Sequence, residues 1–565
     1  MEKTIDCLII GHNEVNFEKY VNDIKNMGIN TGAYRDLNLS FIRYNERPYH
    51  PTGIFNFIAA SEGLPGKAAA PIQDGESFSA TVSYLGTYLD RRGYTFDYVN
   101  SFKAGQNQLA EKLKQQNILT IAVTTTLYIS VLPLLEIMSF IKKHNTTAKV
   151  IIGGPFIATQ CRVADEATLE YLFNSIGADI YVNSSQGEAA LVNIIEALKK
   201  NKSLDTINNI QYKANGRYNK TPLLRENNKL SENMVKWTLF SDRLGEYVNL
   251  RTTISCPFSC SFCGFPEHAG KYQTVEPAAV ETELNQLRQI PSVKCLHFID
   301  DTFNVPVNRF KNLLRMMVKN KYRFKWHSQL RCQFIDRDAV ELLKESGCEG
   351  VFLGIESGND QILANMNKAA SIKDYLKGIE LLKKYGILTY GSFIIGFPGE
   401  TYETALDTVK FIENSEIDFY RTQLWYCDPL TPIYKQREKY HIKNSNFEWS
   451  HATMNSKEAG DLIDNIFLSI KKSTWLPQYG FDFTTIFHLT NRGISLGKAR
   501  NFIRSFNQGL EEKLLNPTRN EVSPGVMNRL KNSLIYDDVQ FDEMENHRQI
   551  KKIQEQGIVI DFDLD

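Results

Sequence analysis

Three cysteines lie close together near the middle of the chain, at Cys256, Cys260 and Cys263. Their spacing, CxxxCxxC, places three soft sulfur ligands on one short loop. Each thiolate can bind one iron of a cubane iron–sulfur cluster, which leaves the fourth iron without a protein ligand. An open coordination position separates catalytic from structural metal sites. The spacing therefore predicts a [4Fe-4S] cluster that takes part in chemistry.

Two other interpretations of this loop stay open. A structural zinc site needs a fourth ligand, and His268, five residues after Cys263, could supply it. The cysteines could also be ordinary core residues. The chain has nine cysteines, an odd number, and the apolar run at its N-terminus is too short for a signal peptide. We therefore expect a cytoplasmic protein without a disulfide framework.

The cysteine loop follows the first strand of a series in which strands and helices alternate. Apolar runs predict six strands, and helical patterns separate them, for example at residues 279–289, 338–345 and 373–385. Six such units indicate an incomplete parallel barrel, whose active site is expected at the carboxyl ends of the strands. The predicted strands are residues 247–254, 294–299, 324–328, 350–355, 388–395 and 417–424.

The part of the chain before this barrel shows another alternation. Short apolar runs predict buried strands, with helical patterns between them. Such alternation is typical of a parallel sheet with helices on both faces, which binds ligands at the carboxyl ends of its strands. Residues 26–75 break the rhythm and are expected to form an irregular insertion. The predicted strands are residues 7–10, 96–99, 119–123, 150–152 and 180–182.

We predict an α/β chain in four parts, because 565 residues are too many for one core. Residues 1–215 would form a doubly wound, flavodoxin-like domain that carries the irregular insertion. The polar residues 216–245 would form a linker, and residues 246–428 a partial (β/α)6 barrel. Beyond the barrel the alternation stops, so residues 429–565 are expected to form a mostly helical region that caps the substrate site.

The composition is that of an ordinary globular protein, with 42% hydrophobic and 23% charged residues. Lys and Arg together number 65, as do Asp and Glu, so no net charge draws the chain to nucleic acid or an anionic membrane. The most apolar stretch, residues 118–138, contains four threonines, Pro133 and Glu136, which favours a strand, a turn and a helix over a membrane span. We expect neither nucleic acid nor a membrane as a partner.

The cysteine motif, with the aromatic Phe262 before its last cysteine, resembles the radical S-adenosylmethionine (SAM) superfamily. In that family the amino and carboxylate groups of SAM bind the fourth iron. Polar segments at the ends of the later predicted strands follow the family's order, and the resemblance covers roughly residues 246–424. These segments are residues 298–303, 329–331, 354–358 and 391–400.

The resemblance implies a set of SAM contacts. Arg331 would bind the SAM carboxylate, and Glu356 would accept hydrogen bonds from the ammonium or the ribose. Arg331 could instead form a salt bridge on the barrel rim, and Glu356 could cap the following helix. One of Asp300 and Asp301 could cap the helix near Pro306, and the glycines could be only turn residues. The residues implied for SAM are Phe262, Asp300, Asp301, Arg331, Glu356, Gly391, Gly396 and Gly399.

A doubly wound domain before such a barrel resembles the cobalamin-binding domain of class B radical SAM enzymes. Its loops would wrap the corrin and its nucleotide tail, with a phosphate at the N-terminus of the helix after Gly187. The DxHxxG motif is absent, so we expect no histidine below the cobalt and consider Tyr128 as a lower-face neighbour. A phosphate-binding or purely structural domain is the alternative. The residues implied for cobalamin are His12, Asn13, Thr124, Thr125, Thr126, Leu127, Tyr128, Gly153, Gly154, Pro155, Ser184, Ser185, Gln186, Gly187 and Glu188.

At finer resolution, residues 7–14 and 32–39 resemble the N-terminal region of the P-methyltransferases of phosphinothricin-type biosynthesis. Members of such groups act on unrelated natural products. The resemblance therefore does not identify the substrate.

These features together predict a cobalamin-dependent radical SAM methyltransferase whose cofactors are a [4Fe-4S] cluster, SAM and cobalamin. A methyl group would pass through methylcobalamin to an unactivated carbon or a phosphinate phosphorus of a small natural-product or peptide substrate. An electron donor such as flavodoxin or ferredoxin would be a partner. The alternatives are a radical SAM and cobalamin cyclase or ring-rearranging oxidoreductase, and a corrinoid-binding sensor with a structural cluster.

Overall fold

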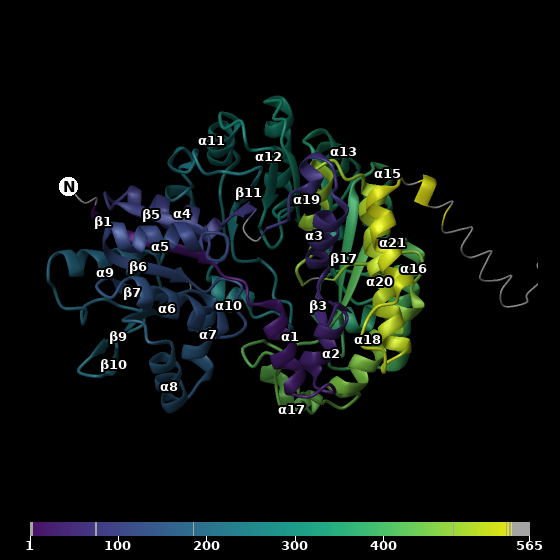
Figure 1. Ribbon diagram of the computed structural model, residues 1–565, viewed down its shortest axis with the longest axis horizontal. Helices are drawn as coiled ribbons and strands as arrows, with labels where there is room; N and C mark the ends of the chain where they lie inside the picture. The colour runs from purple at the N-terminus through teal and green to yellow at the C-terminus, as the bar shows by residue number, and fades with distance from the viewer. Residues whose placement is uncertain are drawn as a thin grey trace, which may run out of the picture.

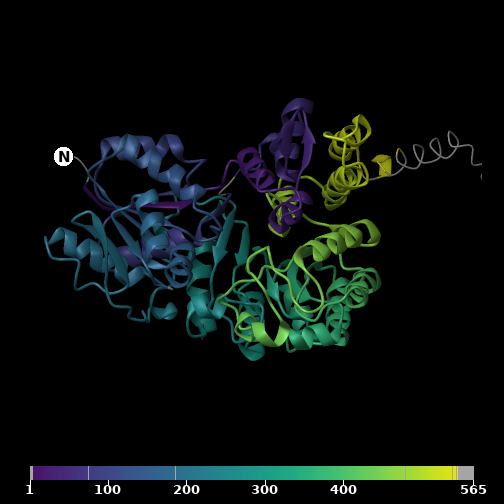
Figure 2. The ribbon, with the colours of Figure 1, turned by 90° about the horizontal axis from the view of Figure 1, so that it is seen from below.

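A computed structural model describes residues 4–73, 76–184, 186–477, 479–537, 539–541 and 544. Two sheets dominate the molecule, one built from the N-terminal part of the chain and one from its middle (Figure 1). A third region, which contains segments from near both ends of the chain, packs beside the second sheet (Figure 2). Within these described ranges, no helix is long and apolar enough to cross a membrane.

The first sheet has seven strands in the order β10-β9-β8-β7-β6-β1-β5. The pairs from β8 to β5 are parallel, and the hairpin of β9 and β10 adds an antiparallel edge. All five predicted strands lie within observed ones and are confirmed, whereas β10 extends the sheet beyond residue 215 into the expected linker. The strands are β1 (Thr4–His12), β5 (Phe96–Ser101), β6 (Asn117–Thr124), β7 (Lys149–Gly153), β8 (Ile180–Val182), β9 (Ile210–Ala214) and β10 (Arg217–Lys220).

Helices cover both faces of this sheet, so the domain is doubly wound. On one face lie α4 (Ala80–Asp90) and α9 (Glu188–Lys199), and on the other α5 (Gln106–Gln115), α6 (Leu132–His144) and α8 (Glu166–Ile176). Successive residues of β1 enter opposite cores, which is why its sequence is a continuous apolar run rather than an alternating one.

The second sheet is a partial barrel of eight parallel strands in the order β19-β18-β17-β16-β15-β14-β11-β4. Six of them correspond to the predicted strands. The edge strands β4 (Ser77–Phe78) and β19 (Thr474–Trp475) come from outside the predicted barrel, and at two residues each they are too short for any periodicity to reveal. The other strands are β11 (Tyr247–Leu250), β14 (Cys295–Phe298), β15 (Lys325–Leu330), β16 (Cys348–Glu356), β17 (Leu388–Ile395) and β18 (Phe419–Leu424).

The prediction of the first barrel strand, residues 247–254, is wrong at its carboxyl end, because β11 ends at Leu250. The chain turns after β11, and the next residues form β12 (Thr253–Ile254), which pairs with β13 (Gln273–Thr274). The buried carboxylate of Asp300 causes the turn, because it accepts hydrogen bonds from the backbone nitrogens of Thr252 at 2.7 Å and Thr253 at 2.8 Å. The barrel helices are α11 (Pro277–Arg288), α12 (Val307–Lys319), α13 (Arg337–Glu345), α15 (Ile372–Lys384) and α16 (Tyr402–Ser415).

The expectation that residues 26–75 form an irregular insertion is wrong, because much of this segment is helical. Two of its helices and a hairpin pack with the C-terminal helices (Figure 2). Arg35 forms ion pairs with Asp461 at 2.7 Å and Asp464 at 2.6 Å. The contacting elements of the segment are α2 (Gly32–Asn38), β2 (Ile42–Tyr44), β3 (Arg47–Tyr49) and α3 (Pro51–Glu62), and those of the C-terminal region are α18 (Ser456–Ser469), α20 (Leu496–Leu515) and α21 (Pro524–Ile535). Helix α1 (Phe17–Asn26), just before the segment, packs against α2 and β3.

The C-terminal region also enters the barrel. The aromatic side chains of helix α19 (Phe483–Asn491) pack against side chains of the barrel strands. Phe487 stacks on His327 at 4.8 Å and Phe483 on Tyr390 at 5.6 Å between ring centroids. Gly350 on β16 leaves room for this, because a Cβ there would lie 2.7 Å from the Phe487 ring. The expected capping region therefore fills part of the barrel interior.

Candidate active site

The cysteine loop begins directly after β12. Cys260 is buried, Cys256 and Cys263 are half-buried, and all three are free thiols. The pKa of the Cys263 thiol is raised to about 11, chiefly by burial and in part by the neighbouring Cys260 and Cys256, so these sulfurs lie close enough to influence Cys263. Ser261 anchors the loop, because its backbone nitrogen donates to Met366 O at 2.8 Å. The thiols are thus gathered on one fixed loop.

These thiols fit a cubane cluster. A cubane binds its three cysteines through three different irons, so the sulfurs need not converge on one ion. In the part of the chain that the structure describes, no three His, Cys, Asp or Glu side chains converge closely enough to hold a single metal ion. His268, the possible fourth ligand of a zinc site, lies on α10 (Phe265–Ala269), where burial and the nearby Arg162 lower its pKa.

Arg331 lies against the cysteine loop. Its Nη2 is 3.1 Å from Cys260 Sγ, its Nη1 donates to Lys368 O at 2.8 Å, and its guanidinium covers the Phe258 ring at 3.5 Å. The side chain is buried, so the alternative of a salt bridge on the exposed rim does not describe it. The guanidinium thus donates a hydrogen bond directly to one of the three cysteine sulfurs. The contact between Arg331 and SAM stays a prediction.

We expect Arg331→Ala to lower SAM affinity by one to two orders of magnitude. The estimate follows from the loss of a charge-assisted hydrogen bond, which contributes roughly 1.5–3 kcal/mol. Binding of SAM to the anaerobically purified protein measures the effect, and the iron content should be unchanged. Arg337→Ala, which removes an exposed guanidinium from α13, is the matched control. An unchanged SAM dissociation constant in Arg331→Ala would exclude a direct contact.

Glu356 forms a buried ion pair that the sequence did not reveal. Its Oε1 lies 2.8 Å from Lys368 Nζ, and both side chains are less than one-tenth exposed. Lys368 Nζ also lies 5.6 Å from the centre of the Phe262 ring, next to the cysteines. Glu356 does not cap the following helix, α14 (Asp360–Asn365), because Asn359 does so. No motif in the sequence marks Lys368 as a site residue, because it lies in the loop that follows α14.

The two aspartates after β14 have different roles. Asp300 is 1% exposed, and its oxygens are used by the turn at Thr252 and Thr253, so the prediction that it contacts SAM is corrected: it is a structural group. Asp301 is exposed to a large cavity, and desolvation there together with Asp300 raises its pKa to about 7. Neither aspartate caps α12, whose N-cap is Pro306.

Removing the Asp300 carboxylate should destabilise the barrel. In Asp300→Ala two buried backbone N–H groups lose their acceptor, and each unsatisfied donor costs about 1–3 kcal/mol. We expect a clear fall in the melting temperature of the purified protein, measured by thermal unfolding. Asp301→Ala, one residue along the chain, is the control and should melt like the unmodified protein. Equal melting temperatures for both variants would contradict the structural role.

Packing accounts for the three glycines implied for SAM. A Cβ at Gly391 would lie 2.7 Å from the Ile417 side chain, and one at Gly396 would lie 2.4 Å from the Trp449 ring. At Gly399 it would lie 2.5 Å from Asn365 Nδ2. Close packing is therefore sufficient to require glycine here, and backbone contact with adenine stays a prediction.

A cavity of about 930 Å³ joins the two sheets. One wall consists of the loops at the carboxyl edge of the first sheet, and the opposite wall of barrel residues such as Ser255, Asp301 and Gln329. The C-terminal region contributes Phe481, Thr485 and others. The residues predicted for cobalamin that line this cavity are His12, Thr124, Thr126, Leu127, Gly153, Gly154, Pro155, Gln186, Gly187 and Glu188.

Four other residues predicted for cobalamin are not part of the cavity wall, and Ser185 lies outside the described residues. Asn13 and Tyr128 bind each other in the core, where Asn13 N donates to the Tyr128 hydroxyl at 2.8 Å. Thr125 Oγ1 donates to Gly153 O at 2.9 Å, and Ser184 Oγ accepts from Gln186 N at 3.4 Å. These residues stabilise the loops through hydrogen bonds and do not face the cavity.

Leu127, rather than Tyr128, faces the cavity. Its backbone is left-handed, with φ at 69°, and its side chain is 80% exposed, whereas Tyr128 is 7% exposed. The suggestion that Tyr128 neighbours a lower corrin face is therefore corrected, since its ring is buried beneath this loop. Leu127 gives the first-sheet wall an apolar surface.

The N-terminus of α9 is not open to a phosphate, which corrects the prediction for residues 184–188. Glu226 from the linker occupies it, because its carboxylate accepts from Ala189 N at 2.9 Å and Ala190 N at 3.1 Å. A carboxylate is a favourable partner for a helix N-terminus for the same electrostatic reason as a phosphate. No pattern in the sequence indicates that the linker returns to this helix.

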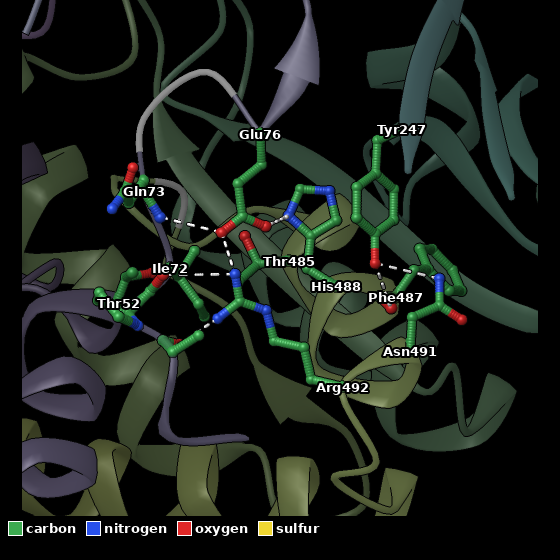
Figure 3. A network of polar contacts seen from close by, with 12 residues as sticks. Thr52, Ile72, Gln73, Glu76, Tyr247, Thr485, Phe487, His488, Asn491 and Arg492 are labelled. Carbon is green, nitrogen blue, oxygen red and sulfur yellow. Dashed lines mark hydrogen bonds and ion pairs between the residues drawn. The ribbon is translucent and has the colours of Figure 1, made fainter. Parts of the chain in front are cut away.

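Figure 3 shows a polar network on the wall formed by α19. Glu76, just before β4, accepts from Gln73 N at 3.0 Å and pairs with His488 Nδ1 at 3.3 Å and with Arg492. Burial, together with the nearby charge of Arg492, lowers the pKa of His488 to about 3, so the imidazole is neutral. Because Nδ1–H donates to Glu76, Nε2 is a hydrogen-bond acceptor. Residues 73–76 and 488–492 lie far apart in the sequence, so no motif predicts that they contact each other.

Comparison with known proteins supports this picture. Residues 250–412 match the model of the Radical SAM superfamily. An uncharacterized methyltransferase of Pyrococcus horikoshii is 27% identical over 285 residues, which are 49% of this chain and 60% of that protein. An anaerobic magnesium-protoporphyrin IX monomethyl ester cyclase of Rubrivivax gelatinosus is 24% identical over 421 residues, 70% of this chain and 73% of that one. The match thus spans less than two-thirds of the Pyrococcus relative.

Two solved structures share the fold. The methyltransferase TsrM of Kitasatospora setae, with cobalamin and a [4Fe-4S] cluster bound, superposes with a TM-score of 0.52 at 19% identity over 63% of this chain and 71% of its own. OxsB, a cobalamin-dependent radical enzyme with aqua-cobalamin and S-adenosylmethionine bound, gives 0.57 at 12% identity over 99% and 82%. The predicted fold class is confirmed.

Proposed function

We propose that this chain, whose barrel belongs to the radical SAM superfamily, is a cobalamin-dependent radical SAM methyltransferase. The observation that carries the proposal is the shared cavity. Loops of a doubly wound sheet and the mouth of a radical SAM barrel open into one space, next to the cysteine loop. This arrangement supports the proposal, because a ligand of the sheet would lie opposite a ligand of the barrel.

The chain would hold three cofactors. Cys256, Cys260 and Cys263 would bind a [4Fe-4S] cluster, the strand ends of the barrel would bind SAM, and the first-sheet loops would bind cobalamin. When bound, these groups supply the electron that cleaves SAM and the methyl group that is transferred. The protein's part is to position and to shield: Arg331 would hold the Cys260 sulfur through its hydrogen bond, and the buried Glu356–Lys368 pair would fix the adjoining strand end.

The size and lining of the cavity suit a large ligand with an apolar body. Its volume of about 930 Å³ lies at the upper end of the range for ligand sites, roughly 300–1,000 Å³. Leu127 provides an apolar surface, and the hydroxyls of Thr124 and Thr126 provide polar groups at its edge. Gly154 adopts φ of 113°, a conformation that favours glycine and allows a ligand close to the backbone.

The substrate would lie on the barrel side of this cavity. We propose a small natural product or a peptide that is methylated on an unactivated carbon or on a phosphinate phosphorus. The neutral His488 would offer an acceptor there, held in one tautomer by Glu76. A flavodoxin or ferredoxin is the proposed electron donor, since the cluster needs a one-electron reductant.

A cyclase or ring-rearranging oxidoreductase is the second candidate. It is favoured by the match to the magnesium-protoporphyrin IX monomethyl ester cyclase, which covers 70% of this chain. The mass of the product separates the two, because methylation adds one methyl group and cyclisation does not.

The proposal is tested with anaerobically purified protein, SAM, a reductant and candidate substrates taken from the genome neighbourhood. We expect about four irons per chain, formation of 5′-deoxyadenosine, and a product heavier by one methyl group. Retained iron and corrin without any 5′-deoxyadenosine in the presence of substrate would favour a corrinoid-binding sensor with a structural cluster.

The pH dependence of SAM binding tests Asp301. Its pKa of about 7 means that the carboxyl is mostly neutral at pH 6 and mostly charged at pH 8. If the carboxylate accepts from the SAM amino group, affinity should rise by about tenfold over this range, following the ionised fraction. Asp301→Asn should flatten the profile. Glu188→Gln removes another cavity carboxyl with a pKa of about 7 and should keep the pH dependence. A flat profile in the unmodified protein would exclude this contact.

A further inference from the structure

A smaller pocket adjoins the main cavity, between the linker and the loop after α10. Its volume is about 280 Å³. Gln186 and Ala269 line both spaces, so a ligand in the main cavity can extend into this one. We call it the side pocket; its other lining residues are Arg225, Glu226, Asn227, Gly270, Lys271 and Gln273.

Two cations meet in the side pocket from separate segments of the chain. Arg225 comes from the linker and Lys271 from the loop between α10 and β13, and both side chains are exposed. The Arg225 guanidinium lies over Gly270, since a Cβ at that position would be 3.1 Å from Nη2. A residue with a side chain at 270 would push the guanidinium away, so the glycine keeps it in the pocket.

The acid in the pocket does not pair with these cations. Glu226 Oε2 accepts from Ala189 N at 2.9 Å and from Asn228 Nδ2 at 2.7 Å, while Oε1 accepts from Ala190 N at 3.1 Å. Its charge is therefore directed to the N-terminus of α9. The two cations are left to attract an anion into the pocket.

We propose that the side pocket binds the phosphate of a ligand whose body fills the main cavity. On the proposed function, on which this inference rests, the ligand is cobalamin and the phosphate is the diester of its nucleotide tail. Arg225 can bind two phosphate oxygens at once, and Lys271 adds a second positive charge. Glu226 closes the other anion site nearby, the α9 N-terminus, which directs the tail to the side pocket.

The test compares hydroxocobalamin with cobinamide, a corrinoid that lacks the phosphate, the ribose and the base. Dissociation constants are measured by absorbance on the full-length, anaerobically purified protein. We expect hydroxocobalamin to bind about tenfold more tightly than cobinamide, the usual scale of a charge-assisted contact. In Arg225→Gln/Lys271→Gln this advantage should disappear, while cobinamide binds as before. Arg217→Gln/Lys220→Gln removes two cations from β10 and should change neither affinity.

Glu226→Gln separates the two anion sites. If the phosphate lies in the side pocket, this variant should change the affinity for hydroxocobalamin by no more than about twofold. A strong gain in affinity would place the phosphate at the α9 N-terminus and overturn the inference.

The outcomes are distinguishable. An equal loss for both corrinoids in the double variant, with iron content unchanged, would overturn the inference, and so would no loss for either. If the unmodified protein binds both corrinoids equally tightly, the tail site is wrong while the cobalamin proposal survives. If it binds neither, the cobalamin part of the proposed function fails.

Discussion

Replacing Cys256, Cys260 and Cys263 together with alanine is expected to abolish the iron–sulfur cluster and all cleavage of SAM. The reason is that the cysteine loop provides every protein ligand that a cubane with one open iron requires. Iron analysis of the anaerobically purified variant should fall from about four atoms per chain to none, and 5′-deoxyadenosine should not form. Single replacements should have nearly the same effect, because two thiolates hold a cubane poorly.

Cys161→Ala is the matched control for this experiment. Cys161 is a half-buried free thiol outside the cysteine loop, and its sulfur accepts a hydrogen bond from Gln211 Nε2 at 3.4 Å. This variant should keep its iron and its activity. If the triple variant still cleaves SAM, the central claim fails. One zinc per chain in place of iron would support the structural zinc site instead.

The parts of the fold that the sequence predicts well are those governed by local pattern. Residues 119–123 and 150–152 are strands because unbroken apolar runs suit a sheet buried on both faces. The order of motifs after the barrel strands also follows from local sequence, because parallel strands bring their carboxyl ends to one edge. The match over residues 250–412 falls on this part of the chain.

The parts that the sequence does not reveal depend on contacts between distant segments. β4 and β19 are two residues long and become strands only because the barrel edge pairs with them. The helices of residues 26–75 carry weak patterns, since their apolar side chains are buried against a region more than 400 residues away, as the contact between the Phe55 and Phe502 rings at 5.8 Å illustrates. Tertiary packing overrides local propensity in both cases.

The same reason explains which site residues escaped prediction. Position in a motif predicted Asp300, Glu356 and the N-terminus of α9 as ligand-binding groups. A motif does not show that each of these groups already has a partner within the protein, which is Thr252, Lys368 and Glu226 respectively. Each occupying residue comes from a loop or linker whose path cannot be read from periodicity. Position in a motif therefore indicates where a ligand site lies, and only the hydrogen bonds show which groups remain to bind it.

Replacing Gly154 with valine is expected to remove most of the corrin that the full-length protein retains through gel filtration. Gly154 adopts φ of 113°, and a Cβ there would lie 2.8 Å from Thr125 Oγ1 and 3.1 Å from Thr125 N. A side chain would therefore displace the loop that carries Leu127, the apolar surface expected beneath the corrin. Iron content should be unchanged, because the cysteine loop belongs to the other sheet.

Gly93→Ala is the control for the corrin experiment, since Gly93 also has a positive φ, 77°, but no atom lies within 4 Å of its Cβ position. The unmodified protein should retain close to one hydroxocobalamin per chain. In the cob(II) state, paramagnetic resonance should show no nitrogen hyperfine splitting from a lower ligand, because Leu127 faces the cavity from this wall. A nitrogen triplet would instead indicate a histidine of the cavity wall, such as His12 or His268. No retained corrin at all would leave a radical SAM barrel whose N-terminal domain serves another purpose.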